Sequence, residues 1–121
     1  MKNSELINFI ILLETITGSI VKNKDSYFPK ALVNFNEKTI FEQEITNSLT
    51  KIEFAQECFF GKQRLIIDAD PTIKLKRLKV NGITFENFPN KEIICKQPKK
   101  GTYIFEFECP YAYYFINRWV T

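Results

Sequence analysis

The sequence has no histidine and only three cysteines among its 121 residues. Without imidazole, the chain lacks the commonest general base and the commonest metal ligand of proteins. Catalytic mechanisms that depend on a histidine are therefore excluded. Cys58, Cys95 and Cys109 are widely spaced, match no zinc-binding pattern and are odd in number, which argues against a complete disulfide framework. A reduced, intracellular setting suits them, and Cys109 continues the apolar register of its segment, so we expect it to be buried.

Glycine, proline and excess charge are also scarce. Four glycines and five prolines are too few for a low-complexity linker. The 17 basic and 14 acidic residues leave a net charge of only +3, so nucleic acid is not the expected partner.

Long apolar runs are missing as well. The run that ends at Leu13 is short, with Glu5 before it and Glu14 after it. It is unlike a signal peptide and falls well below the ~20 residues that a membrane-spanning helix needs. We therefore expect no membrane segment and no secretion by a signal peptide.

Aromatic residues, in contrast, are abundant. The chain has 12 phenylalanines and 5 tyrosines and is 45% hydrophobic, which excludes a disordered chain. Aromatic and β-branched side chains suit pleated, half-buried surfaces. The length predicts a single domain over residues 1–121, large enough to bury a core without metal or disulfide bonds.

Alternating apolar and polar residues predict β-strands along most of the chain. The clearest strand runs from Thr102 to Glu108, with Tyr103, Phe105 and Phe107 pointing inward. Similar segments, separated by turn signals about every 8 to 12 residues, indicate eight to ten short strands. The predicted fold class is all-β, a jelly-roll-like antiparallel β-sandwich.

Three local patterns refine this prediction. Residues 5–16 alternate like a buried strand, although an N-terminal helix is the alternative. Between Ile73 and Val80 the apolar positions change phase, which predicts a β-bulge near Lys76 and Arg77. Asn81-Gly82 follows directly and is the strongest dipeptide signal for a hairpin turn.

The order of these segments resembles a known family. The segments that carry the resemblance are an opening strand at 7–16, a hairpin at 29–42, a strand at 60–67, a charged strand leading into Asn81-Gly82, and an ending of the form Gly-x-Tyr-x-Phe-x-Phe-x-x-Pro-Tyr at 101–111. Together they resemble small jelly-roll proteins of large tailed bacteriophages, which look like carbohydrate-binding modules. The resemblance implies a non-enzymatic module that contacts a glycan or another virion protein, located on the virion or in the host cytoplasm.

An aromatic block after Pro110 supplies the first candidate site. Exposed tyrosine and tryptophan rings stack on sugar rings, and many sandwich modules hold glycans in this way. Alternation favours Tyr114 and Trp119 as the exposed pair, and Tyr111 is a third candidate. The alternative is that this block packs against the core or forms a closing strand.

A basic stripe supplies the second candidate site. Lys74, Lys76, Arg77 and Lys79 lie close together in one predicted strand and would suit phosphate or an acidic glycan. The alternative is a solvated outer face or an edge strand, where lysine discourages aggregation.

No other pattern indicates chemistry. Asp68-Ala69-Asp70 has the spacing of a metal-binding carboxylate pair, but Pro71 makes it an ordinary strand end. We therefore predict no metal, no cofactor and no catalytic residue. The alternative function is a protein–protein module without a glycan ligand, such as an assembly subunit, an inhibitor of a host protein, or a chain that pairs with a second copy of itself.

Overall fold

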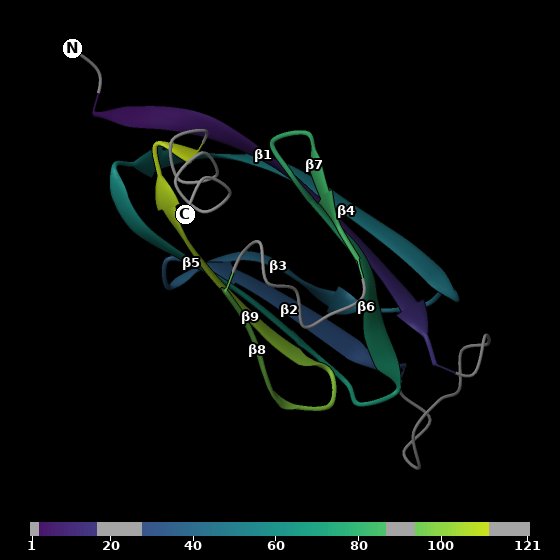
Figure 1. The fold of residues 1–121 in the computed structure, drawn as a ribbon. Coiled ribbons are helices and arrows are strands. Elements are labelled where there is room, and N and C mark those ends of the chain that lie inside the picture. Colours follow the sequence, from purple (N-terminus) through teal and green to yellow (C-terminus); the bar gives the residue numbers. More distant parts are fainter. Residues whose placement is uncertain (1–2, 17–27, 87–93, 112–121) are drawn as a thin grey trace.

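A computed structural model describes residues 3–16, 28–86 and 94–111 of the chain (Figure 1). Nearly all regular structure in these residues is β-strand, and none of it is a helix long and apolar enough to span a membrane. The strands are β1 (Ser4–Thr15), β2 (Lys30–Phe35), β3 (Lys38–Glu44), β4 (Leu49–Phe59), β5 (Gly61–Ala69), β6 (Ile73–Val80), β7 (Ile83–Phe85), β8 (Ile94–Lys99) and β9 (Thr102–Cys109).

The strands form two sheets that face each other (Figure 1). The four-stranded sheet has the order β4-β1-β6-β7, and the five-stranded sheet has the order β3-β2-β5-β9-β8. Every pair of neighbours is antiparallel. The structure therefore confirms the predicted all-β antiparallel sandwich.

The core lies between the two sheets and follows the alternation of the sequence. Ile7, Phe9, Ile11 and Leu13 point inward from β1 and are at most 1% exposed. The ring of Phe9 lies 4.8 Å from that of Phe54 on β4, and further contacts reach Phe35 at 5.3 Å and Phe107 at 6.2 Å on the facing sheet. Residues 5–16 thus lie in or beside a core strand rather than a helix, because only a strand presents every second side chain to the facing sheet.

The predicted irregularity in β6 is also present. The register between β1 and β6 shifts between Leu12 and Leu13, whose partners are Arg77 and Leu75, so Lys76 is the extra residue of a bulge. Asn81 and Gly82 then form the hairpin turn to β7, with φ angles of 49° and 90°. The bulge leaves two consecutive side chains, Lys76 and Arg77, exposed to solvent.

Two of the cysteines are part of the core. Cys58 and Cys109 are buried, as expected for Cys109, and the three cysteines are free thiols. Burial raises the pKa of the Cys58 thiol to about 11, and the pKa of Cys109 is raised as well. Both residues therefore behave as small hydrophobic side chains at neutral pH.

Candidate functional site

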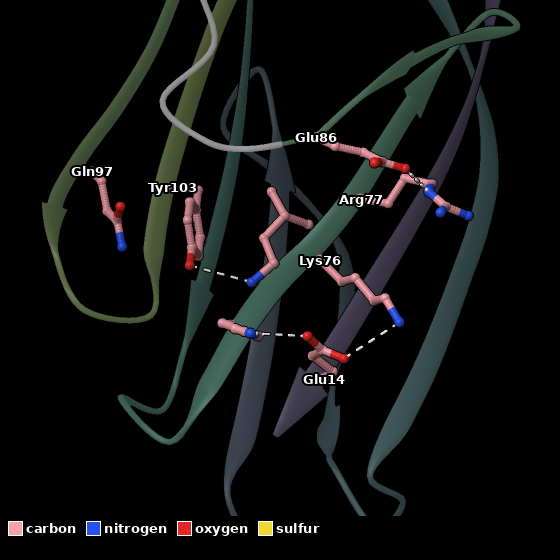
Figure 2. Close-up of a pocket in the computed structure, with 8 residues that line it drawn as sticks. Glu14, Lys76, Arg77, Glu86, Gln97 and Tyr103 are labelled. Atoms are coloured by element: carbon pink, nitrogen blue, oxygen red, sulfur yellow. Dashed lines mark hydrogen bonds and ion pairs between the residues drawn. The ribbon is translucent and has the colours of Figure 1, made fainter. Parts of the chain in front are cut away.

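A groove with a volume of about 400 Å³ lies where β6 of one sheet approaches β8 and β9 of the other (Figure 2). We call it the β6–β9 groove. Its lining combines cations, carboxylates, an amide and a phenol from both sheets: Glu14, Lys74, Leu75, Lys76, Arg77, Glu86, Gln97 and Tyr103.

Tyr103 joins the two sheets beside the groove. Its side chain leaves β9 toward the core and is only 5% exposed. Its hydroxyl accepts a hydrogen bond of 3.3 Å from the backbone N–H of Leu75 in β6 (Figure 2). The sequence correctly predicted an inward residue, and the structure adds that its polar end fixes the spacing between β6 and β9.

Glu14 organises the lysines of the groove. It lies opposite Lys74 in the β1–β6 pair, and its carboxylate is 3.1 Å from the Lys74 ammonium and 3.6 Å from that of Lys76 (Figure 2). The hydrogen bond from Lys74 is the largest effect and lowers the pKa of Glu14; burial opposes it in part, and the charges of both lysines lower the pKa further. Glu14 is therefore ionised at neutral pH and holds two ammonium groups beside the groove.

Arg77 and Glu86 form a second ion pair in the lining. The Arg77 Nε donates a hydrogen bond of 2.6 Å to the Glu86 carboxylate, which lies just after β7 (Figure 2). Gln97 on β8 adds an exposed amide, which both donates and accepts hydrogen bonds. The lining thus carries three cations against two carboxylates, with donors and acceptors interleaved.

The predicted basic stripe is divided by the fold. Lys74, Lys76 and Arg77 line the β6–β9 groove, whereas Lys79 does not. Lys79 instead lines a second hollow of about 290 Å³ on the four-stranded sheet, which it shares with Arg77 and with residues of β1 and β4: Ile10, Leu12 and Lys51. Arg77 lines both hollows, and Lys79 lies two residues further along β6, past the end of the groove lining.

Of the three candidate residues in the aromatic block, only Tyr111 lies within the described part of the chain. Tyr111 is 2% exposed, and its ring packs edge-on against Phe107 at 5.5 Å. Its backbone N–H also donates a hydrogen bond to the Glu5 carboxylate of β1. Tyr111 therefore closes one end of the core, and our expectation that it stacks on a ligand does not suit this buried position. Tyr114 and Trp119 lie outside the described residues.

The Asp68-Ala69-Asp70 motif has protein partners instead of a shared ligand. Asp68 accepts a hydrogen bond of 2.8 Å from the Thr102 hydroxyl. Asp70 accepts bonds from the N–H and the hydroxyl of Thr72, at 3.0 and 2.8 Å, which form the turn before β6. Within the described ranges, no group of three or more cysteine, aspartate or glutamate side chains is placed to hold a metal ion.

Four polar residues of the groove were not identified as site residues from the sequence. Glu14, Glu86, Gln97 and Tyr103 come from or follow four different strands, and only the pairing of β6 with β1 and β7 and its approach to β9 bring them together. A sequence signal existed for Glu14 alone, as the charge that interrupts an apolar strand pattern.

Comparisons with known proteins give one structural similarity. No family profile matches the chain, and no curated protein is significantly similar in sequence. Among solved structures, the chain is similar to vCBM60, described as belonging to the calcium-dependent carbohydrate-binding modules. The two are 12% identical, the match covers 84% of this chain and 90% of that chain, and the TM-score is 0.48. We draw no functional conclusion from a similarity at this level.

Proposed function

We propose that this chain is a non-catalytic binding module whose ligand is a glycan carrying an acidic group, held in the β6–β9 groove. The observation that carries the proposal is the lining itself, in which cations, carboxylates and an amide from both sheets surround one hollow of about 400 Å³. Small-molecule sites have volumes of about 300 to 1,000 Å³, so a short oligosaccharide segment fits this space.

The charges of the groove favour an acidic ligand. Lys74 and Lys76 share one carboxylate, that of Glu14, so the two ammonium groups are not fully neutralised. Sugar hydroxyls both donate and accept hydrogen bonds and can therefore use the Glu14 carboxylate and the Gln97 amide. A carboxylate, sulfate or phosphate on the glycan would take the remaining ammonium donors.

The same geometry favours binding over catalysis. A general acid needs a pKa near the working pH, yet the lysines lower the pKa of Glu14. Glu86, the other carboxylate of the lining, is held by Arg77. The chain also has no histidine to serve as a base.

The biological setting that we propose comes from the sequence resemblance to jelly-roll proteins of large tailed bacteriophages. In this setting the chain is phage-encoded, resides in the host cytoplasm or on the virion, and contacts a glycan or a virion protein. Mass spectrometry of purified phage particles whose genome encodes this chain tests the proposal. Peptides of the chain in intact particles would support a virion location, and their absence from particles and infected cells would contradict this setting.

A glycan array tests the proposed ligand class. The wild-type chain should bind glycans that carry carboxylate, sulfate or phosphate groups in preference to their neutral counterparts. Lys76→Ala and Gln97→Ala should each weaken this binding about tenfold, the effect of losing one hydrogen bond to a charged or polar ligand. Lys62→Ala is the matched control, because Lys62 is an exposed lysine of β5 that does not line the groove.

Two results would overturn the proposal. One is an array on which no acidic glycan binds. The other is binding that Lys76→Ala and Gln97→Ala leave at the level of the Lys62→Ala control.

The second candidate function is assembly through protein–protein contacts, without a glycan ligand. Exposed apolar side chains favour it: Leu6, Phe59 and Phe60 are 61%, 67% and 48% exposed. Leu6 and Phe59 point outward from neighbouring strands and are offset by two residues in the β1–β4 register. Large exposed apolar patches mark protein–protein contact surfaces, so this is where a partner protein would bind.

A further inference from the structure

One edge of β4 has no partner among the described strands along its whole length. Its 11 residues pair with β1 from Phe59 opposite Ser4 to Leu49 opposite Glu14. Among the described strands, none pairs with the other edge of β4, which ends the four-stranded sheet (Figure 1). A long strand edge presents a row of backbone N–H and C=O groups and is a template for pairing with another chain.

The outward face of β4 has an apolar residue at each end and charges between them. Leu49 is 50% exposed and Phe59 is 67% exposed, although both are large hydrophobic side chains. Lys51, Glu53 and Glu57 lie between them and are also exposed. The strand is therefore apolar at its two ends, basic near its start and acidic near its end.

We propose that two copies of the chain pair through these edges, with the two β4 strands antiparallel and Phe54 on the two-fold axis. The two four-stranded sheets then form one continuous eight-stranded sheet. In this register Leu49 lies opposite Phe59 of the second copy, and Lys51 lies opposite Glu57 of the second copy. Each pair occurs twice by symmetry, so the apolar ends cover one another and the opposite charges meet.

The inner face agrees with this register. Phe54 stacks on Phe9 with ring centres 4.8 Å apart, but it stands at the edge of the sheet and is only partly buried. On the two-fold axis it meets Phe54 of the second copy, which extends the aromatic core across the interface.

Neighbouring registers are less favourable. Directly opposite residues of two antiparallel strands point to the same face of the sheet. A register that sets an inward residue of β4 opposite an outward one would therefore turn core side chains of one copy to the solvent side, so only registers that pair residues of the same face are possible. A two-fold axis at Glu53 sets the carboxylates of Glu53 from the two copies against each other. An axis at Ala55 sets Glu53 against Glu57 of the second copy. An axis at Ile52 pairs only residues 49 to 55 and leaves Phe59 exposed.

One edge of the other sheet, β3, provides a comparison. β3 ends the five-stranded sheet, but it has seven residues, and its register with β2 shifts between Val33 and Asn34. A short, irregular edge pairs poorly with a second chain. Its exposed Lys38 is therefore a matched control for Lys51 of β4.

Sedimentation and light scattering on the full chain test the inference. The wild type should have twice the 14.3 kDa mass of one chain. Lys51→Glu and Glu57→Lys should each weaken the dimer about tenfold or more, because each sets two pairs of like charges opposite one another. The double variant Lys51→Glu with Glu57→Lys should restore the dimer, and Lys38→Glu should leave it intact.

Circular dichroism of each variant separates a loss of pairing from a loss of folding. The inference is overturned if the folded wild type stays a monomer at its highest soluble concentration. It is equally overturned if the dimer is insensitive to both single substitutions in β4, or if Lys38→Glu is the substitution that breaks it. None of these residues lines the β6–β9 groove, so the result is independent of glycan binding.

Discussion

Single residues fix the turns that hold the two sheets in place, and Gly101 shows this most clearly. It lies between β8 and β9 with φ of 84°, a conformation that residues with a Cβ rarely adopt. A Cβ at this position would clash with the carbonyl oxygen of Ala69 and lie 2.8 Å from that of Asp70. The Gly101 carbonyl also accepts a hydrogen bond of 2.8 Å from Ala69 N–H, so the backbone cannot easily move away.

We therefore expect Gly101→Ala to lower the free energy of unfolding by about 2 to 4 kcal/mol, the sum of backbone strain and a steric clash. Gly82→Ala is the control, because Gly82 has φ of 90° but no atom within 4 Å of the position that a Cβ would take. Its loss should be about 1 to 2 kcal/mol, from strain alone. Urea unfolding measures both values, and equal losses would show that the contact with Ala69 does not matter.

Glu14 gives a pH-dependent prediction at the same scale. The pKa of its carboxyl is lowered below the ordinary value near 4.5 by Lys74 and Lys76. A group whose pKa is lower in the folded state adds stability above its unfolded pKa and loses it as pH falls through the folded pKa. Wild type should therefore exceed Glu14→Gln in unfolding free energy by up to about 1 kcal/mol at pH 7.

This advantage of the wild type should shrink below pH 4.5 and vanish once Glu14 is protonated in both the folded and the unfolded state. Unfolding curves of the wild type and of Glu14→Gln measure this difference. They are recorded from neutral pH down to the acid range in which Glu14 is protonated. A difference that stays constant across this range would mean that the ion pairs with the lysines do not contribute.

At the scale of elements, the corner between β4 and β5 depends on a buried amide. Gln63 is 4% exposed and donates hydrogen bonds to the carbonyls of Phe59 and Gly61. Its own oxygen accepts a bond of 2.7 Å from the Asn36 side chain, which in turn accepts one of 2.8 Å from Arg64 N–H. This network connects the β2–β3 turn to the point where the chain passes from one sheet to the other.

Gln63→Leu should therefore cost about 1 to 3 kcal/mol of unfolding free energy, because it leaves buried polar partners without hydrogen bonds. Gln43→Leu on the exposed face of β3 is the control and should change stability by less than about 0.5 kcal/mol. Thermal unfolding compares the two. A loss for Gln63→Leu no larger than that of the control would show that the corner network does not stabilise the fold.

The sequence predicted elements well where one side chain in two is apolar, and poorly where contacts are distant. The alternation in residues 102–108 and the phase change near Lys76 predicted a strand and a bulge, and the alternation in residues 5–16 favoured a strand over the alternative helix. The close approach of Gly101 to Ala69, in contrast, depends on tertiary structure and has no signal in the local sequence. A tyrosine can either stack on a sugar or close the core, and the sequence alone does not distinguish the two roles for Tyr111. Its packing against Phe107 in the folded chain does.

The candidate site was predictable only in its basic half. Lys74, Lys76 and Arg77 are close in sequence, so a stripe was visible. Glu14 meets them only through the β1–β6 register, and Gln97 only because the two sheets face each other. Information on strand order and register is absent from local patterns, which is why the carboxylates and the amide were not predicted.

At the scale of the whole molecule, the sandwich offers two separate surfaces. The β6–β9 groove combines residues of both sheets, whereas the edge of β4 that no described strand pairs with belongs to one sheet. A dimer through β4 leaves both grooves open and gives each particle two binding sites. Two sites on one particle would raise the apparent affinity for a repetitive glycan without any new contact.

The central claim is that the β6–β9 groove binds an acidic glycan, and an NMR titration tests it most directly. The ¹⁵N-labelled chain is titrated with oligosaccharides that carry carboxylate, sulfate or phosphate groups, and with neutral oligosaccharides of equal length. We predict that an acidic oligosaccharide shifts the backbone amides of 74–77, 97 and 103, and that its neutral counterpart does not. The claim is contradicted if no acidic oligosaccharide shifts these amides, or if the shifts gather on a surface away from the groove.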